Sequence, residues 1–408
     1  MLSLLGTVKN YHWGKKGPQS LVYRLAVLNA QSDAKLSENE AYAELWMGNH
    51  VMDPSLVKDT HQPLGAYLAK QPPEVVGSTG DLSFLLKVLS IETALSIQVH
   101  PNKKEAEELH KLFPDVYKDD NHKPEMAIAL TPFLALCGFR PVDKILDFLK
   151  TFPAVAELLG QENVQKLQKD SGTEGHSEGL KACFTRLMES TPEEIAKCLE
   201  ATKKQMEVAM EPENILLKTF LTLQRDFPGD VGILTVFFLH IVELKPGEAI
   251  FLSANEPHAY ISGDCIEAMA CSDNVIRAGL TPKPKDIPTL IRHLKYNPQP
   301  LASKIFTPQK LNGDEFVDLF SPPVKDFAVI RYRIPAGVKE HSVKLKNHAS
   351  VLIILSGKAK LEYPGSPGIA VSPGSVIFLP GNIGNQLNIQ KEAAEELFEA
   401  YQATYNDF

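Results

Sequence analysis

The chain has 408 residues, of which 44% are hydrophobic and 23% charged; this excludes a mainly disordered protein and allows several buried cores. Its 50 acidic residues outnumber 42 basic ones, and the formal charge of −8 disfavours nucleic-acid binding without excluding a small anionic substrate. The longest apolar run, residues 231–242, is shorter than the roughly 20 residues of a membrane span. We expect no signal peptide, and five cysteines without a CxxC pair favour reduced thiols and a cytoplasmic protein.

Strand-like and helix-like patterns alternate along the chain. Residues 1–140 read mostly as short strands and loops. From residue 142 to about 224 the apolar side chains recur at helical spacing, and Thr191-Pro192-Glu193-Glu194 has the pattern of a capped helix start. Strands with Gly and Pro turns then continue towards the C-terminus. The expected strands include residues 21–27, 83–89, 231–242, 328–333 and 350–355.

A Pro-Gly turn that leads through a short apolar strand to a second Pro turn occurs twice, at residues 245–257 and 372–380. This turn–strand–turn pattern is typical of cupin-type jelly rolls, so its two copies predict two barrels. The alternative is that the two copies are unrelated hairpins. The predicted fold is therefore mainly β with an α-helical insert. We expect a discontinuous first barrel at residues 1–141 and 225–314, an all-helical domain at 142–224, and a C-terminal barrel at 315–408.

Candidate ligands for a metal ion are spread over three segments. Gln98 and His100 lie two apart on a predicted strand, so both side chains point to one face. Glu125 stands before another apolar strand, and His258 follows a Pro turn. Each residue alone is a weak signal, because a surface or packing role is its default. Together, two imidazoles, a carboxylate and an amide oxygen suit zinc, and could also hold iron or manganese.

Several motifs resemble those of the type I mannose-6-phosphate isomerases, also called phosphomannose isomerases. They are residues 11–14, 43–48, 98–101, 122–126, 255–260 and 272–283. The resemblance covers most of the chain and keeps the order of its parts. It implies interconversion of mannose 6-phosphate and fructose 6-phosphate by metal-assisted proton transfer between C1 and C2. This reaction links glycolysis to mannose-derived nucleotide sugars such as GDP-mannose. The resemblance also implies that the first barrel is catalytic, with one Zn²⁺ per chain held by Gln98, His100, Glu125 and His258.

The resemblance places the family's catalytic arginine at Arg277. Its planar, permanently charged guanidinium could hold an enediolate or a phosphate. Proton transfer also needs a general acid and a general base. Glu267, Asp273, Lys123 and a metal-bound water are the candidates, and the sequence does not rank them. A surface salt bridge is an equal alternative for Glu267.

Three further side chains are candidate substrate contacts. Ser96 shares a strand face with two of the expected metal ligands, and Lys283 could contact a phosphate or a hydroxyl group. Tyr260 lies in one of the matching motifs. Trp46 is expected to pack beside the pocket rather than to take part in the chemistry.

The C-terminal barrel lacks a comparable set of ligands. His348 has no clear carboxylate partner in the sequence, and no histidine closely follows Pro380-Gly381, so we expect this barrel to be metal-free. Two other functions stay open: another cupin metalloenzyme, such as a dioxygenase or a different sugar isomerase, and a non-catalytic sugar-binding protein. We expect a phosphosugar as partner, neither nucleic acid nor membrane, and a monomeric chain.

Overall fold

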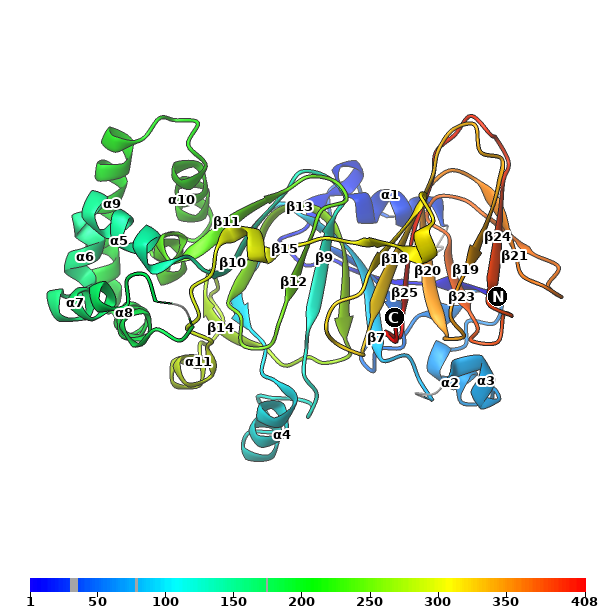
Figure 1. Ribbon diagram of the computed structural model, residues 1–408, viewed down its shortest axis with the longest axis horizontal. Helices are drawn as coiled ribbons and strands as arrows, with labels where there is room; N and C mark the ends of the chain where they lie inside the picture. Colours follow the sequence, from blue (N-terminus) through cyan, green and yellow to red (C-terminus); the bar gives the residue numbers. More distant parts are fainter. Residues whose placement is uncertain (30–35, 78–79, 174) are drawn as a thin grey trace.

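The computed structural model describes residues 1–29, 36–77, 80–173 and 175–408. The helices between residues 142 and 226 gather at one end of the long axis, an eleven-stranded sheet occupies the middle, and further sheets lie at the other end (Figure 1). Strands in all the sheets of the described residues pair antiparallel, and the chain combines β structure with a helical part, as predicted. None of the helices in the described part of the chain is long and apolar enough to cross a membrane.

The middle sheet is built around one long strand, β13 (His258–Ala270). Its second half pairs with β7 (Phe84–Ile91) and β9 (Glu125–Ala129), and its first half pairs with β10 (Phe133–Phe139) and β8 (Ile97–Val99). The change of partners falls at Gly263, whose φ of +112° suits glycine. The other strands of this sheet are β2 (Thr7–Lys9), β5 (Glu44–Gly48), β11 (Leu239–Leu244), β12 (Ala249–Leu252), β14 (Ile276–Gly279) and β15 (Ile305–Phe306).

The helical part is inserted between two strands that pair with each other. β10 and β11 are antiparallel neighbours, with Phe139 opposite Leu239, and the helices lie between them in the sequence. The predicted capping box is confirmed at α9, where Thr191 and Glu194 bond to each other's backbone amides. The helices are α5 (Val142–Thr151), α6 (Pro153–Leu159), α7 (Gln161–Lys169), α8 (Glu178–Met188), α9 (Pro192–Ala209), α10 (Ile215–Asp226) and the 3-10 helix η2 (Val231–Phe237). Their apolar faces and one side of the middle sheet share a single core.

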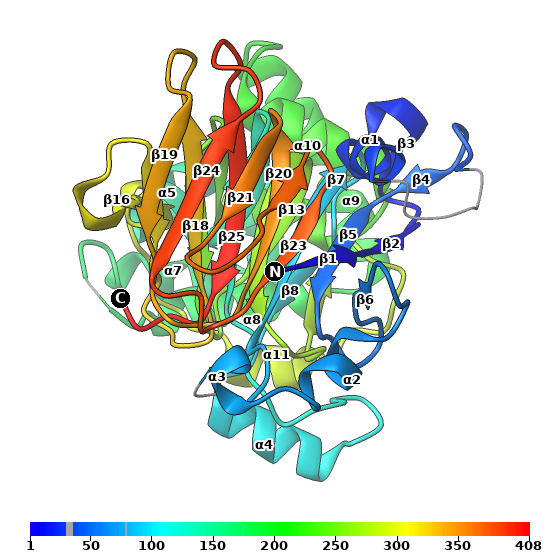
Figure 2. The same ribbon diagram turned by 90° about the vertical axis from the view of Figure 1, so that its right-hand side faces the viewer.

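Two sheets pack face to face in the C-terminal part, and Figure 2 shows the smaller one in front of the larger. The larger has eight strands, ordered β16 (Gln309–Lys310), β17 (Val317–Phe320), β18 (Ala328–Ile334), β25 (Phe398–Thr404), β20 (Ser350–Ser356), β23 (Val376–Leu379), β1 (Leu2–Leu5) and β6 (Leu56–Val57). The smaller has four, ordered β19 (Glu340–Lys344), β24 (Gln386–Lys391), β21 (Ala359–Glu362) and β22 (Ile369–Val371). β1 thus completes a sheet made mostly of C-terminal residues; the predicted domain boundaries stay a prediction.

The eight-stranded sheet is buried on both faces, which explains the continuous apolar run of β20. Leu352 and Ile354 lie in the core shared with the four-stranded sheet. Val351 and Ile353 lie in a second core with Leu86 and other residues of the middle sheet. The two β parts are therefore joined by a continuous hydrophobic core.

The two Pro-Gly turns of the sequence repeat have the same structure. Gly247 has φ +90° and Gly374 has φ +87°, which is the conformation that a type II turn needs after proline. The amide of Glu248 donates to the carbonyl of Lys245 at 2.9 Å, and the amide of Ser375 donates to that of Ser372 at 2.9 Å. Each turn leads directly into a four-residue strand, β12 or β23.

One predicted strand is wrong and a second is wrong in its first part, because these residues form helices. Residues 21–27 lie in α1 (Leu21–Leu28), where the Ser20 hydroxyl accepts a hydrogen bond from the amide of Tyr23 and caps the helix. The first part of the predicted strand at 231–242 is η2, and only its second part is the strand β11. The remaining short elements are β3 (Lys15–Lys16), η1 (Gly17–Gln19), β4 (Ala41–Tyr42), α2 (Leu64–Leu68), α3 (Pro73–Val76), α4 (Lys103–Leu112), α11 (Ile287–His293), η3 (Leu301–Lys304) and η4 (Leu311–Gly313).

Candidate metal centre

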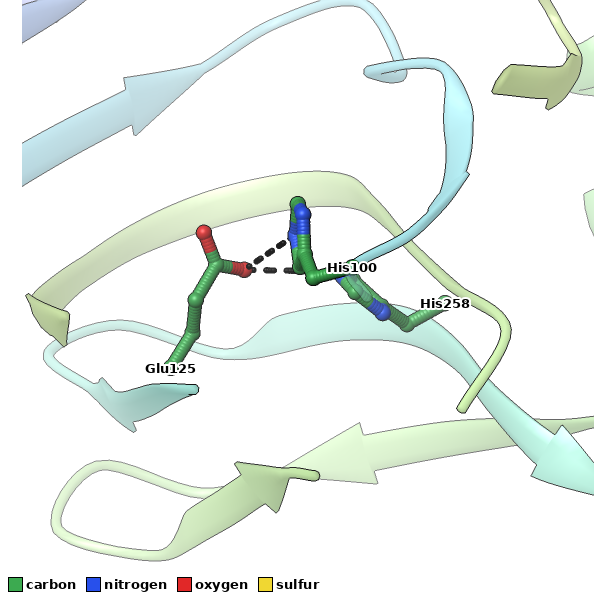
Figure 3. A group of neighbouring side chains, drawn as sticks. All are labelled: His100, Glu125 and His258. Carbon is green, nitrogen blue, oxygen red and sulfur yellow. Dashed lines mark ion pairs between the residues drawn. The ribbon is translucent and has the colours of Figure 1, made fainter. Parts of the chain in front are cut away.

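Three predicted metal ligands meet in the middle sheet. His100 follows β8, Glu125 begins β9, and His258 begins β13, so each stands at the end of a strand. All three side chains are buried, and Figure 3 shows them pointing toward one another. The Nε2 atoms of His100 and His258 lie 3.3 Å and 3.2 Å from the same oxygen, Oε2 of Glu125. Among the residues that the structure describes, this is the one group of three or more such side chains with this geometry.

Each of the two histidines uses its Nδ1 atom for a hydrogen bond, which leaves its Nε2 atom free to bind a cation. The Nδ1–H of His100 donates to the carbonyl of Asn274 at 2.7 Å, and that of His258 donates to the carbonyl of Glu256 at 2.9 Å. The two Nε2 atoms and Oε2 of Glu125 are buried without a hydrogen-bond partner. Unpaired buried polar atoms are costly, and a divalent cation between them would satisfy all three. The donor set therefore fits the expected zinc.

The surroundings of the cluster favour a ligating carboxylate at Glu125 and a neutral imidazole at His100. Burial alone would raise the pKa of Glu125, but the charge of Lys123 and the contacts with the two histidines hold this pKa well below the usual range. Nζ of Lys123 lies 3.1 Å from Oε1 of Glu125, the oxygen that faces away from the histidines. Burial lowers the pKa of His100 to about 4, so its ring is neutral at working pH.

Gln98, the fourth predicted ligand, stands beside the cluster in the sheet. It is directly opposite His258 on β13 and directly opposite Arg277 on β14. Residues directly opposite each other in an antiparallel pair project to the same face, with Cβ atoms about 5 Å apart. The register therefore places the amide of Gln98 between a histidine of the cluster and the guanidinium of Arg277.

Arg277 is half-buried and has no counterion. Its guanidinium makes no hydrogen bond or ion pair with any residue in the described part of the chain. Burial lowers its pKa, but from a value so high that the group stays charged. A desolvated guanidinium without a partner is costly, and an anionic group of a substrate would offset that cost.

A row of charged and aromatic side chains crosses the sheet on the same face as Glu125. In register, Glu267 of β13 lies opposite Lys87 of β7, and Lys87 lies opposite Trp46 of β5. Nζ of Lys87 is 3.0 Å from Glu267 and 3.6 Å from Glu44, and it lies 5.0 Å from the centre of the Trp46 ring. The Trp46 indole N–H donates to Glu44. Sequence reasoning named Glu267 and Trp46 but missed Lys87 and Glu44.

The acidic side chains of this row and Lys87 shift one another's pKa values. Burial alone would lower the pKa of Lys87, yet the charges of Glu267 and Glu44 raise it above the usual range. Burial raises the pKa of Glu267 against the opposing charge of Lys87. A buried carboxylate with a raised pKa beside a metal cluster is the kind of group that can exchange protons near neutral pH.

The other predicted residues lie at different distances from the cluster. Tyr260 is buried on β13, with its ring 6.3 Å from that of His258. Lys283 is exposed in the loop after β14, and Ser96 is half-buried just before β8. Asp273 has 42% of its side chain exposed and lies 3.6 Å from His50. Within the described residues, no hydrogen bond or ion pair links Ser96, Lys283 or Asp273 to the three-residue cluster.

Converging imidazoles and a carboxylate, with an unpaired arginine and a buried acid–lysine pair nearby, are typical of a metal-dependent enzyme. Comparison with known proteins identifies the class further. Residues 1–142 match the family model described as phosphomannose isomerase type I, catalytic domain, and residues 158–239 match its helical insertion domain. The chain belongs to the type I phosphomannose isomerases, as the sequence motifs suggested, and it is an isomerase.

Relatives and solved structures agree with this family. The chain is 42% identical to mannose-6-phosphate isomerase of Mus musculus over 393 residues, 92% of each chain. It is 40% identical to the enzyme of Homo sapiens over 411 residues, 96% of each chain. A structure of mannose 6-phosphate isomerase bound with zinc and yttrium matches with TM-score 0.83 and 30% identity, over 100% of this chain and 99% of that one. A mutant of phosphomannose isomerase from Salmonella typhimurium matches with TM-score 0.84 and 31% identity, over 100% of both chains.

Proposed function

We propose that this isomerase interconverts mannose 6-phosphate and fructose 6-phosphate. The observation that carries the proposal is the buried cluster of His100, Glu125 and His258 beside the unpaired Arg277, in a chain of this family. The reaction moves a proton between C1 and C2 of the open-chain sugar while both neighbouring oxygens are stabilised. The alternatives of a dioxygenase or a non-catalytic sugar-binding protein are not favoured by the family.

One zinc ion per chain would be held by His100, Glu125 and His258, with Gln98 as the fourth ligand. The unpaired Nε2 and Oε2 atoms of the cluster support this assignment, and the register of β8 with β13 supports the place of Gln98. When bound, zinc supplies a Lewis acid that polarises oxygens of the sugar. The second hydrogen bond of each histidine fixes the ring that would bind it.

The proton-transfer candidates closest to the cluster are Glu267 and Lys123. Glu267 is buried and held at 3.0 Å by Lys87, and burial raises its pKa, which suits a group that takes and returns a proton. Lys123 contacts Glu125 and is largely buried. Asp273 is more exposed and pairs with His50, so we place it at the rim of the site. Arg277 would stabilise the enediolate oxygens, because its guanidinium is charged and unpaired.

We also propose that the chain contains two related cupin-like barrels. The two Pro-Gly turns with equal geometry support two related cupin-like barrels, of which the first is catalytic. The sequence predicted no carboxylate partner for His348, but the structure gives it one, because Asp407 lies 2.9 Å away. Two ligands are still fewer than a zinc site needs, so a metal-free second barrel stays a prediction. A cytoplasmic location, a monomeric chain and a place between glycolysis and nucleotide-sugar synthesis also stay predictions.

A coupled assay with purified, zinc-loaded protein tests the proposed function. Mannose 6-phosphate should be converted to fructose 6-phosphate, and the rate should not depend on dissolved oxygen. Free mannose should be a much poorer substrate, because it lacks the phosphate. The matched control is His258→Ala, which removes one ligand and should abolish turnover. Zinc-loaded wild-type protein that does not convert mannose 6-phosphate would refute the proposal.

A further inference from the structure

A cavity distinct from the metal centre lies where the middle sheet meets the eight-stranded sheet. Its volume is about 380 Å³, within the usual range for small-molecule sites. Its walls come from α1, from the turns after β9 and before β12, and from strands β18, β20 and β25 of the other sheet. It touches β9 at Ala129, the end opposite Glu125. Both β parts therefore contribute to one cavity.

Arginine is the charged residue that dominates this cavity. Arg24, Arg331 and Arg333 line it, and Glu399 is the one acid among the lining residues. The chain as a whole carries a formal charge of −8, so a cavity with three guanidinium groups departs from the average surface. Guanidinium groups match phosphate oxygens in charge and in geometry.

Arg331 forms a fixed wall of the cavity. Its Nε donates to Asp318 at 3.0 Å, so most of its charge is already compensated. Its Nη1 packs against Gly247, where an added Cβ would lie only 2.1 Å away. The backbone of the turn before β12 therefore lies against the guanidinium of Arg331. This contact brings the two β parts together at the cavity.

Arg24 and Arg333 keep their charges available. Nη1 of Arg24 donates to the carbonyls of Pro18 at 2.8 Å and Gln19 at 3.3 Å, which orient the group without neutralising it. Arg333 lies opposite Glu399 in the β18–β25 pair, but the two form no ion pair. Neither arginine makes an ion pair with any residue the structure describes. The carbonyl contacts orient Arg24, and the two uncompensated guanidinium groups outnumber the single acid of the cavity, which suits an anionic ligand.

We propose that this cavity binds a phosphate group, either as inorganic phosphate or as the phosphate of a small metabolite. Arg24 and Arg333 hold the phosphate, and the half-buried side chain of Leu355 provides apolar surface for an organic part. Because the walls belong to both β parts, bound phosphate ties them together. The site is separate from the isomerase centre, and the proposal does not depend on the sugar substrate assigned above.

Isothermal titration calorimetry on the zinc-loaded full chain tests the site, with inorganic phosphate and glycerol 2-phosphate as two separate probes. The pocket variant is Arg24→Gln/Arg333→Gln. The matched control is Lys58→Gln/Lys70→Gln, which removes two exposed lysines outside the cavity. In the pocket variant one binding event should weaken at least about tenfold for the tighter probe, since two charge-assisted contacts are lost. In the control variant it should not change. The tighter probe identifies the source of the phosphate.

Two further readouts separate this result from misfolding and from binding at the metal centre. The pocket variant should keep the kcat and KM of the wild type, which shows that it is folded. Phosphate should raise the thermal midpoint of the wild type more than that of the pocket variant, because ligands that bind the folded state stabilise it. Equal binding of both probes by the wild type and the pocket variant would overturn the proposal. So would a wild type that binds neither probe.

Discussion

Replacing Lys87 by methionine would remove a buried ammonium group and keep a side chain of similar length. Lys87 is only 5% exposed, and its Nζ lies 3.0 Å from Glu267 and 3.6 Å from Glu44. Removing one partner of a buried ion pair costs about 3–5 kcal/mol, because the remaining charge is left uncompensated. We expect Lys87→Met to lower the free energy of unfolding by about this amount at neutral pH.

The loss of stability in Lys87→Met should depend on pH, and the protonation of Glu267 determines whether it grows or shrinks as pH rises. Burial already raises the pKa of Glu267, and Lys87 opposes that rise. Without Lys87 the folded-state pKa rises further, while the unfolded value stays near about 4.3. Between these two values the folded variant binds more protons than the unfolded chain, so its stability falls as pH rises, by at most about 1.4 kcal/mol per pH unit. The variant should be closest to the wild type at or below about pH 4.3.

Urea unfolding followed by tryptophan fluorescence measures this effect, because the Trp46 ring lies 5.0 Å from Nζ of Lys87. Lys58→Met at an exposed position is the control and should change stability by no more than about 0.5 kcal/mol. Adding Glu267→Gln to Lys87→Met should recover part of the loss, since it removes an uncompensated charge. A loss below about 1 kcal/mol with no dependence on pH would refute the reasoning.

Three other changes test the site and the core. Arg277→Lys should keep the fold and the metal content while kcat and kcat/KM fall together by about 10²-fold, since a point charge replaces a planar fork; unchanged kinetics would contradict the role of Arg277. Chelation should abolish turnover and added zinc should restore it, as measured by the coupled assay, whereas metal-free protein with full activity would exclude the proposed centre. Phe184→Ala should destabilise the helical part by about 3–5 kcal/mol in thermal denaturation, because Phe184 is fully buried with its ring 5.1 Å from that of Phe139. A loss below about 1 kcal/mol would show that this aromatic packing contributes little.

The metal cluster could be predicted because its residues stand in recognisable local patterns. His100, Glu125 and His258 each follow or begin a strand beside a proline, and their motifs match a family. Lys87 was missed, although a lone lysine in a fully buried eight-residue strand is itself a signal. Its partner Glu267 is far away in the sequence, and they meet only through the register of β7 with β13. Sequence patterns do not give that register.

The two segments that were predicted as strands but form helices were misread for separate physical reasons. Residues 21–27 are rich in residues that favour strands, but Val22, Leu25 and Ala26 are the buried ones, and that spacing is helical. All seven residues of η2 are buried, so that segment shows no periodicity from which a helix could be recognised. The side chain of Asp230 accepts a hydrogen bond from the amide of Gly232 and marks where the helix starts. In both segments, the capping residue was therefore a better indication of a helix than the pattern of apolar residues.

The interleaved path of the chain bears on the order in which the protein is made and folds. β1 lies between β6 and β23 in its sheet, so its pairing with β23 waits until Val376–Leu379 have been synthesised. β10 likewise waits for β11 until the helical insert has been synthesised, and pairing over such separations is slow. A nascent chain that ends before residue 258 carries only part of the three-residue cluster. Metal binding at the proposed centre would therefore follow the synthesis of His258, and metal content would report on chains that have been elongated past this residue.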